Sequence, residues 1–491
     1  MAIIAFPGFI GPSNVNQSPI QDQERTVNFI LERSQSRAAS SPVALYPSPG
    51  FQEAGSVDQV VGRASFAQGR CFVVIGTGFY ELTLTGPDTL TATLRGTVAL
   101  DELPATIATN GDGGNQVFVT SGGNGYIYNL LTDVFSQVAA LNGIATMGAM
   151  LDSYFISLDA NSSTFFISDL NDGLVFDPTQ FAQRSIQPDP WVSMAVIYQD
   201  IWLFGTQTSE VWYDTGQSPF PFAPRQSGLV PFGIAAPFSV KVVSGALMWL
   251  AQTAQGGNMV VRATGFTPEI VSTFALTYAF DHYERVDDAV GDTFQFEGHT
   301  LYLLTFPTAR VTWCYDVTAN AWTEFGTWNS ADNVYDPWRT LFHMFAFGKH
   351  WWLDRLSGKI WHSDSDLGLD VDGLPIRRLR RAPALQQDNK RLLLKDFELV
   401  GQMGVGTNTG DGTNPQVTLT CSTDGGRTFG NAINASIGRA GQYDIRAVWH
   451  RLPMARKFVP ELVTSAPVPI RWSYASIDVN VAELDQPQPV A

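Results

Sequence analysis

The chain contains 491 residues, of which 15% are charged and 12% are aromatic, and its formal net charge is −16. The charge is unevenly spread: residues 1–375 hold 16 Lys and Arg against 36 Asp and Glu, whereas residues 376–471 hold 14 against 7. Such a split predicts two surfaces with different partners. It also excludes a uniformly charged protein with one type of surface.

Cysteine usage and hydropathy exclude two further classes of protein. The three cysteines, Cys71, Cys314 and Cys421, are too few and too scattered for a disulfide framework or a zinc site, which indicates folding in a reducing compartment. The apolar start, Met1–Ile10, has no basic residue before it and is interrupted by Pro7 and Gly8, so we do not expect a signal peptide. No run of eighteen apolar residues occurs, and we expect a soluble protein without a membrane anchor.

Residues 294–325 show the pattern around which the chain is organised. Four short segments rich in β-branched and aromatic residues alternate with turns that contain Gly, Pro or Asn. We expect strands at 294–296, 300–306, 311–315 and 321–325. Four antiparallel strands, with central strands apolar on both faces, are typical of one blade of a β-propeller.

A turn residue followed by an aromatic-rich strand recurs along the chain. The seven occurrences are 69–75, 115–119, 152–156, 200–204, 245–250, 298–303 and 348–353. Their starts are 37 to 53 residues apart, and repeats of about 40–50 residues are typical of propeller blades. The sequence therefore predicts an all-β fold with a six- or seven-bladed β-propeller. An irregular array of β-sandwiches with the same composition is the alternative.

The flanking segments differ from the repeated units. Prolines interrupt residues 1–62, which we interpret as an N-terminal extended arm, and residues 63–366 form the predicted propeller. Residues 367–480 are interpreted as a β-rich docking module whose strands interleave with the arm, and residues 481–491 as a flexible tail. Within the propeller, Gln217–Pro237 contains five prolines and is predicted to be a long docking loop.

The only dense basic run lies at the start of the C-terminal module. Arginine side chains bind carboxylates and phosphates equally well, so the run fits a solvated edge, an ion-pair contact with an acidic partner or neighbouring subunit, or a phosphate contact. The candidate interaction residues are Arg377, Arg378, Arg380, Arg381, Lys390 and Arg391.

Residues 422–429 match the Asp-box pattern found in sialidases and other propellers. In this pattern the Asp and Ser side chains stabilise a hairpin turn through bonds to the backbone, and the aromatic residue packs underneath. We interpret the motif as a structural turn. Its key residues are Ser422, Asp424, Gly426 and Phe429.

No other motif predicts catalysis or metal binding. The six histidines lack metal-ligand spacing, and the acidic segment 364–373 lacks the carboxylates that an EF-hand requires. Nucleotide-binding loops and a nucleophile with a base beside it are absent from the sequence. We therefore expect no catalytic residue, no cofactor and no metal ion.

Several stretches, in order along nearly the whole chain, carry a family resemblance. They are Asn28-Phe29 with Glu32-Arg33-Ser34, Leu45–Phe51, Trp313–Asp316 with Trp322, the Asp-box segment, and Arg471–Ala475. In this order they make the chain similar to the tail hub, or nozzle, proteins of short-tailed bacteriophages, which are also called packaged-DNA stabilisation proteins.

The resemblance implies a structural role in the virion tail after assembly in the host cytoplasm. Such hubs form a hexameric ring beneath the portal and its adaptor, extend the DNA channel, retain the packaged DNA, and anchor a tail needle, fibre or tailspike. Genomic double-stranded DNA would pass through the lumen, and the acidic propeller residues suit a wall that does not grip phosphates. The alternative function is a carbohydrate-active or glycan-binding propeller of the tail, for which two carboxylates should face one cleft. A generic propeller scaffold is a third interpretation.

Overall fold

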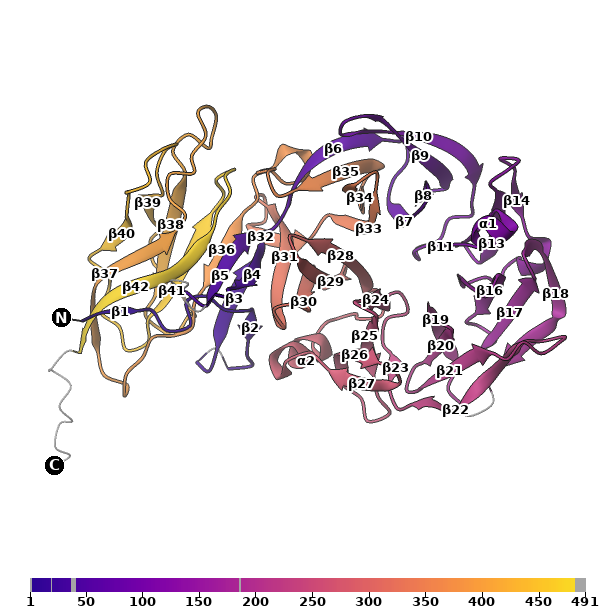
Figure 1. Cartoon of the computed structure of the whole chain (residues 1–491). Coiled ribbons are helices and arrows are strands. Elements are labelled where there is room, and N and C mark those ends of the chain that lie inside the picture. Colours follow the sequence, from indigo (N-terminus) through magenta and orange to yellow (C-terminus); the bar gives the residue numbers. More distant parts are fainter. Residues whose placement is uncertain (1, 19, 37–40, 185–186, 482–491) are drawn as a thin grey trace.

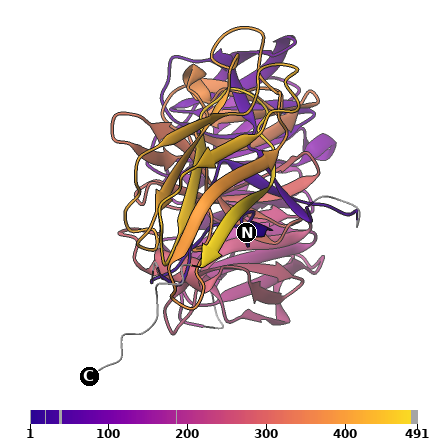
Figure 2. The ribbon, with the colours of Figure 1, turned by 90° about the vertical axis from the view of Figure 1, so that its left-hand side faces the viewer.

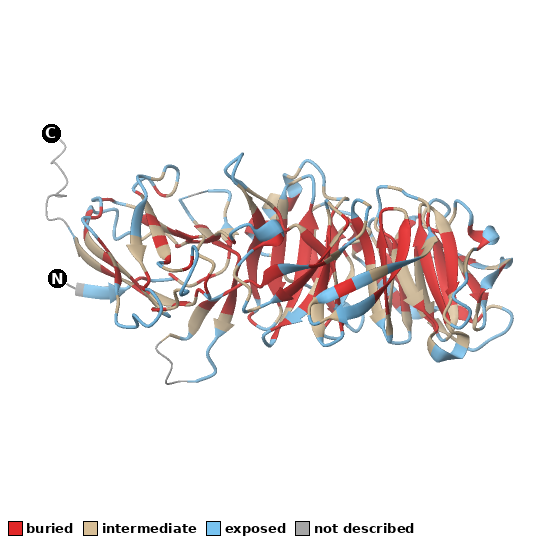
Figure 3. Cartoon of the chain, turned by 90° about the horizontal axis from the view of Figure 1, so that it is seen from above, coloured by how far each residue is buried: buried red, intermediate tan, exposed pale blue. Residues whose placement is uncertain are grey.

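The computed structural model describes residues 2–18, 20–36, 41–184 and 187–481. It contains a ring of seven β-sheets and a β-sandwich beside the ring, so the molecule is elongated (Figures 1 and 3). All but one residue of the predicted tail, 481–491, lies outside the described residues. No helix in the described part of the chain is long and apolar enough to cross a membrane.

The first four blades follow one another along the chain, each as four antiparallel strands ordered from the propeller axis outward. The strands of blades 1 and 2 are β7 (Gly62–Gln68), β8 (Arg70–Ile75), β9 (Gly78–Gly86), β10 (Thr89–Thr97), β11 (Thr106–Thr109), β12 (Gln116–Ser121), β13 (Asn124–Asn129) and β14 (Phe135–Gln137), with the short helices α1 (Gly111–Gly114) and η1 (Ala139–Leu141). Those of blades 3 and 4 are β15 (Met147–Leu151), β16 (Tyr154–Asp159), β17 (Thr164–Asp169), β18 (Asp172–Gln183), β19 (Trp191–Ile197), β20 (Asp200–Gly205), β21 (Ser209–Asp214) and β22 (Phe222–Val230).

Blades 5 and 6 depart from this regular form. In blade 5 the innermost strand is interrupted, and two short strands pair with the same neighbour. The strands and helix are β23 (Gly233–Ile234), β24 (Lys241–Val243), β25 (Ala246–Gln252), β26 (Asn258–Thr264), β27 (Thr267–Ile270) and α2 (Phe274–Asp281). Blade 6 comprises β28 (Val290–Phe296), β29 (His299–Phe306), β30 (Val311–Asp316) and β31 (Ala321–Asn329), with β32 (Val334–Pro337) paired to β31.

The N-terminal segment closes the ring of blades. Blade 7 contains β33 (Thr340–Ala346), β34 (Lys349–Asp354) and β35 (Lys359–Asp364), and its outer strand is β6 (Gly50–Ser56). The register runs from Lys359 opposite Ser56 to Asp364 opposite Gly50. Residues 50–56 therefore belong to the propeller, although the sequence predicted them to be part of a separate arm ending at residue 62. Because the two ends of the propeller are paired in one sheet, the ring cannot open without breaking this pairing.

The second body is a β-sandwich made from both ends of the chain, seen face on in Figure 2. One sheet has the order β4-β5-β42-β37-β40, with β1 paired to β42, and the other contains β3-β36-β41-β38-β39. Its elements are β1 (Ala2–Ala5), β2 (Asn14–Val15), β3 (Gln23–Val27), β4 (Phe29–Arg33), β5 (Val43–Pro47), β36 (Arg378–Arg381), β37 (Leu392–Gly401), β38 (Gln416–Ser422), β39 (Ile433–Ser436), β40 (Ala447–His450), β41 (Val459–Thr464) and β42 (Trp472–Val481). The short helix η2 (Val371–Gly373) precedes β36 and packs against β6 of blade 7. The predicted interleaving of the arm with the C-terminal module is confirmed.

The predicted propeller is confirmed with seven blades, of the six or seven that the sequence allowed. The recurring aromatic segment of each unit is the second strand from the axis, and its side chains are buried because a neighbouring blade covers each face. The predicted loop Gln217–Pro237 is wrong, because β22 occupies residues 222–230. Pro224 fits there since β22 is an outer strand, where a missing backbone donor costs little.

Replacing the buried Trp313 tests the assignment of blade 6. Its side chain is 7% exposed, and its indole nitrogen donates a hydrogen bond to the Tyr283 hydroxyl at 3.0 Å. Trp313→Ala should lower the free energy of unfolding by about 3–5 kcal/mol, because a cavity replaces a large buried ring. Chemical denaturation measures the change, and Phe274→Ala, at a ring that is 95% exposed, is the matched control. Equal denaturation midpoints for the two variants would contradict the assignment.

Candidate functional site

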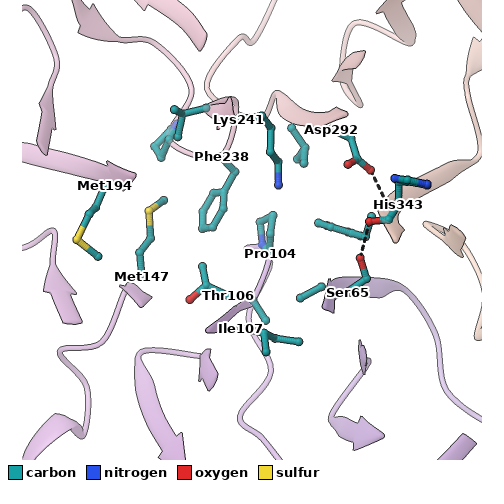
Figure 4. Close-up of a pocket in the computed structure, with 16 residues that line it drawn as sticks. Ser65, Pro104, Thr106, Ile107, Met147, Met194, Phe238, Lys241, Asp292 and His343 are labelled. Carbon is teal, nitrogen blue, oxygen red and sulfur yellow. Dashed lines mark hydrogen bonds between the residues drawn. The ribbon is translucent and has the colours of Figure 1, made fainter. Parts of the chain in front are cut away.

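The propeller axis is filled by side chains from the innermost strands of all seven blades (Figure 4). They leave a cavity of about 240 Å³. Phe238 and Pro104 lie near the centre of the view in Figure 4, and the Lys241 side chain points toward the same central region. A cavity of this size admits at most a small molecule, so no DNA duplex can pass along the axis of one propeller.

One carboxylate, Asp292, lines this cavity. It accepts hydrogen bonds from the backbone nitrogens of His343 at 2.7 Å and Thr293 at 2.8 Å, and burial raises the pKa of the Asp292 carboxyl. Burial also lowers the pKa of the neighbouring His343 to about 3. Since glycoside hydrolysis uses two carboxylates across the substrate, the lining of this cavity does not supply that arrangement.

A second cavity of about 540 Å³ continues the axis and opens on one face of the propeller. It shares Pro104, Phe238, Val290 and Phe342 with the first cavity, and these side chains separate the two. Val60, Leu100 and Leu103 line its mouth and are more than 40% exposed. The axis is therefore closed in the middle, and at the end that holds the second cavity it combines apolar side chains with charged ones, including the carboxylates Asp101, Glu102, Asp287 and Asp288.

The junction between propeller and sandwich is a continuous sheet. Strand β3 pairs with β31 of blade 6 on one side and with β36 of the sandwich on the other. Val27 occupies the shared position, opposite Glu324 and opposite Leu379. No flexible linker separates the two bodies at this point, so we expect them to move as one unit.

Asn28 links the two bodies through hydrogen bonds between its side chain and backbone groups of each body. Its side-chain amide donates to the carbonyl oxygens of Gly326 at 2.8 Å and Arg377 at 2.9 Å, and its side-chain oxygen accepts from the Gly326 nitrogen at 2.9 Å. Asn28 has a φ of 58°, a left-handed conformation that Asn tolerates better than most residues. The sequence analysis included Asn28 in a family motif but assigned it no role.

A partly buried ion pair lies beside Asn28, with the Glu324 side chain 7% exposed and the Arg25 side chain 30% exposed. The Arg25 guanidinium donates to both carboxylate oxygens of Glu324, with Nε at 3.0 and 2.9 Å and an Nη at 2.7 Å from its acceptor. Ser13 donates a further hydrogen bond to Glu324 at 3.1 Å. These residues are about 300 positions apart, so no local pattern could have revealed them. Such bidentate pairs fix orientation as well as adding energy.

Two of the predicted interaction residues are interior groups. Arg380 is 0% exposed and donates to the backbone oxygens of Gly8, Phe9, Gly11 and Pro12, to the Thr26 hydroxyl and to the Glu24 carboxylate. Arg378 is 1% exposed, and burial lowers its pKa to about 10 against the opposing charge of Asp370. Neither residue can face a partner as predicted, because the chain's own N-terminal segment and β-strands enclose both.

The other four predicted residues divide into two groups. Arg377 and Arg381 are partly buried and stack on aromatic rings, Arg377 at 4.2 Å from the Trp328 ring centre and Arg381 at 4.7 Å from that of Phe429. Arg381 also donates to Glu461 at 2.8 Å. Lys390 and Arg391 are exposed beyond the end of β36, and for these two residues the contact with a partner stays a prediction.

The Asp-box residues form the turn that the motif predicts. Ser422 donates to the Asp424 carboxylate at 2.7 Å, and Asp424 accepts from the backbone nitrogens of Arg427 at 2.9 Å and Thr428 at 3.0 Å. The Gly426 nitrogen donates to the Ser422 hydroxyl at 2.7 Å. The ring of Phe429 is only half-buried, beneath Arg381. The Asp-box turn therefore contacts the basic run through the stacking of Arg381 on Phe429.

His299 connects the propeller to the sandwich through two carboxylates. Its Nδ1 lies 2.6 Å from Asp316 of β30 and its Nε2 lies 2.8 Å from Glu32 of β4. Burial opposes protonation, but the hydrogen bonds and charges of Asp316 and Glu32 outweigh it, so the pKa of His299 is raised above its usual value. The sequence analysis had noted of this histidine only that it lacks metal-ligand spacing.

Two family models match the chain, one over the propeller and one over the C-terminal part of the sandwich. The family model described as "Bacteriophage P22 Gp10, beta-propeller" matches residues 25–367, and the one described as "Bacteriophage P22 Gp10, beta-sandwich" matches residues 377–480. The chain belongs to the P22 Gp10 family. It is therefore a structural protein of the phage tail, and the predicted resemblance to tail hub proteins is confirmed.

Beyond the P22 Gp10 family, the similarities are distant. No curated protein sequence matches the chain. Among solved structures, an exo-beta-1,3-galactanase from Phanerochaete chrysosporium has a TM-score of 0.27 at 9% identity, covering 86% of this chain and 100% of that one. An ancestral GH74 enzyme has a TM-score of 0.41 at 11% identity, covering 70% and 51%. Saccharomyces cerevisiae Sqt1 has a TM-score of 0.33 at 9% identity, covering 71% and 95%. Scores this low say nothing about activity.

Removing the Arg380 guanidinium tests how the N-terminal segment is held. Arg380→Met should lower the free energy of unfolding by roughly 3–5 kcal/mol, because it leaves the partly buried Glu24 carboxylate and several buried carbonyl groups without their hydrogen-bond donor. Hydrogen exchange of residues 6–13 should accelerate in the variant. Denaturation and exchange of Arg439→Met, at an exposed arginine of the sandwich, provide the control. An unchanged denaturation midpoint for Arg380→Met would contradict the role.

The raised pKa of His299 predicts a pH-dependent contribution to stability. The protonated ring is favoured in the folded state, so its contribution is complete below the unfolded pKa of about 6.5. It is lost as the pH rises through the higher folded pKa. The stability difference between the wild type and His299→Gln should therefore shrink between pH 6 and pH 8.5 in thermal unfolding. A difference that stays constant or grows over this range would refute the assignment.

Proposed function

We propose that several copies of this protein, six in our expectation, form a ring in the virion tail, and that the ring is the nozzle through which DNA leaves the particle. Membership of the P22 Gp10 family, a group of phage tail structural proteins, supports this function. The closed propeller axis is the observation that carries the argument, because a DNA channel then has to lie between copies and not within one.

The junction supports the same function mechanically. Packaged DNA pushes on the structure that retains it, and a two-body subunit resists such a load only if its parts do not hinge. The continuous sheet through β3 and the partly buried Arg25–Glu324 pair join the bodies without a linker at this point. We propose that the ring extends the channel of the portal and its adaptor, retains packaged DNA, and anchors a needle, fibre or tailspike.

The charge distribution suits a channel that DNA traverses quickly. Each Lys or Arg contact with a phosphate releases counterions and adds affinity. Residues 1–375, which contain the propeller, hold 36 Asp and Glu against 16 Lys and Arg, so a wall formed mainly by propeller surfaces would repel the duplex and keep it centred. We propose that acidic and neutral propeller residues line the lumen.

Particle imaging and a DNA-binding assay test this function together. Electron microscopy of the purified protein, alone and with an adaptor ring, should reveal closed rings with a central opening wider than a DNA duplex. Duplex DNA at physiological salt should bind the ring only weakly. Rings without such an opening, or a channel wall with more Lys and Arg than Asp and Glu, would refute the nozzle. A protein that stays monomeric even with the adaptor would refute the ring itself.

A further inference from the structure

The surface basic charge of the sandwich is concentrated at one end. Residues 386–396 and 450–457, which we call the basic end, contain six Lys and Arg against two Asp. The two segments lie side by side, because the Leu392 nitrogen donates to Ala455 at 2.7 Å and the Ala455 nitrogen donates back at 3.1 Å. Leu392 also pairs with Val481 at the end of β42. The basic end therefore lies beside the N-terminus, at the sandwich end of the molecule (Figure 1).

The basic end has exposed apolar residues among its charges. Lys390, Arg391, Arg451 and Arg456 are exposed. Met454 is 45% exposed and Leu393 is 39% exposed. Charge that is only solvated does not need apolar neighbours, whereas a surface that binds another protein combines both kinds of side chain. The basic end thus has the composition of a contact surface.

The opposite end of the molecule has the opposite charge. Blades 2 to 4, residues 106–230, contain eleven Asp and Glu but only two basic residues, Arg184 and Arg225. Both arginines form ion pairs with carboxylates of blade 4. Arg184 pairs with Glu210 at 3.3 Å, and Arg225 pairs with Asp200 at 2.5 Å. These blades lie on the side of the propeller away from the sandwich (Figure 1). Asp159, Asp189 and Glu210 are buried, and Asp133 pairs with Arg70 and Arg95 of blade 1. The other carboxylates of these blades are exposed or partly exposed.

Four of these carboxylates form what we call the acidic corner: Asp112, Asp152, Asp169 and Asp172. The turns that carry them meet around Asn171, whose nitrogen donates to Ser153 at 3.1 Å and whose side chain lies against Gly113. Within the described ranges, no Lys or Arg pairs with any of the four carboxylates. Leu170 and Leu174, beside them, are 57% and 48% exposed. The acidic corner therefore matches the basic end in mixing charged and apolar side chains, with opposite sign.

We propose that the basic end of one copy binds the acidic corner of the next copy around the ring. This inference rests on the proposed function, and it names the surfaces that meet. Contact between different surfaces of identical subunits is head-to-tail, and it produces a closed ring when the rotation closes. Two basic ends, or two acidic corners, would repel each other. Opposite charges would also speed the encounter of subunits and make assembly sensitive to salt.

Charge reversal on each surface tests the contact. The basic-end variant is Lys390→Glu with Arg451→Glu, and the acidic-corner variant is Asp112→Lys with Asp169→Lys; these side chains have no ion pair within the described chain apart from the long Lys390–Asp388 contact at 4.0 Å. Each variant should raise the protein concentration needed for half-maximal ring assembly by at least about tenfold, because attraction becomes repulsion. A variant with all four changes should recover most of the assembly. Mass photometry at low and moderate salt measures the species.

The control variant is Arg427→Glu with Arg439→Glu, which changes the net charge of the same sandwich equally at exposed positions outside the basic end. It should assemble like the wild type, and all variants should keep the wild-type thermal unfolding midpoint. Rings that form equally well from the reversed variants, or a fourfold variant no better than the worse double variant, would overturn the contact while leaving the ring intact. A wild type that forms no ring would overturn both proposals.

Discussion

The pairing of β3 with two different partners is the constraint on which the rest of this structure depends. One strand of five residues is at once the neighbour of blade 6 and a member of the sandwich. Its polar groups are satisfied by backbone and buried charges, so moving it would expose several donors and acceptors in the interior together. The same N-terminal segment then supplies β4 and β5 to the sandwich and β6 to blade 7. A single stretch of about fifty residues thereby fixes both bodies and their relative orientation.

The blades could be predicted from the sequence because their signals are local. A turn residue followed by an apolar strand is encoded within ten residues, and the four strands expected between residues 294 and 325 match β28 to β31 closely. The junction could not be predicted in this way. Whether Arg380 is a surface charge or an interior donor depends on residues 8–12, some 370 positions away. A basic run has the same local pattern in both cases.

The correction of the arginine run changes the interpretation of the charge asymmetry. Most arginines of the densest basic stretch interact within the molecule. They donate hydrogen bonds to Glu24, to Glu461 and to backbone carbonyl oxygens. The basic surface is instead built from residues that are dispersed in the sequence, such as Lys390 and Arg451, and that the β-bridge at Leu392 brings together. Sequence density of charge is therefore a poor guide to surface potential when arginines can satisfy several buried carbonyl groups at once.

The filled axis and the fused junction lead to the same view of the subunit. A propeller with an open axis could act as a pore by itself, and a sandwich on a flexible linker could search for partners independently. Here the axis is closed by Phe238 and Phe342, and the sandwich shares a sheet with blade 6. What remains is a rigid, elongated block whose two ends differ in charge. Because such a block does not bend, only the arrangement of one copy relative to the next can vary. The surfaces at its two ends then determine which assembly forms.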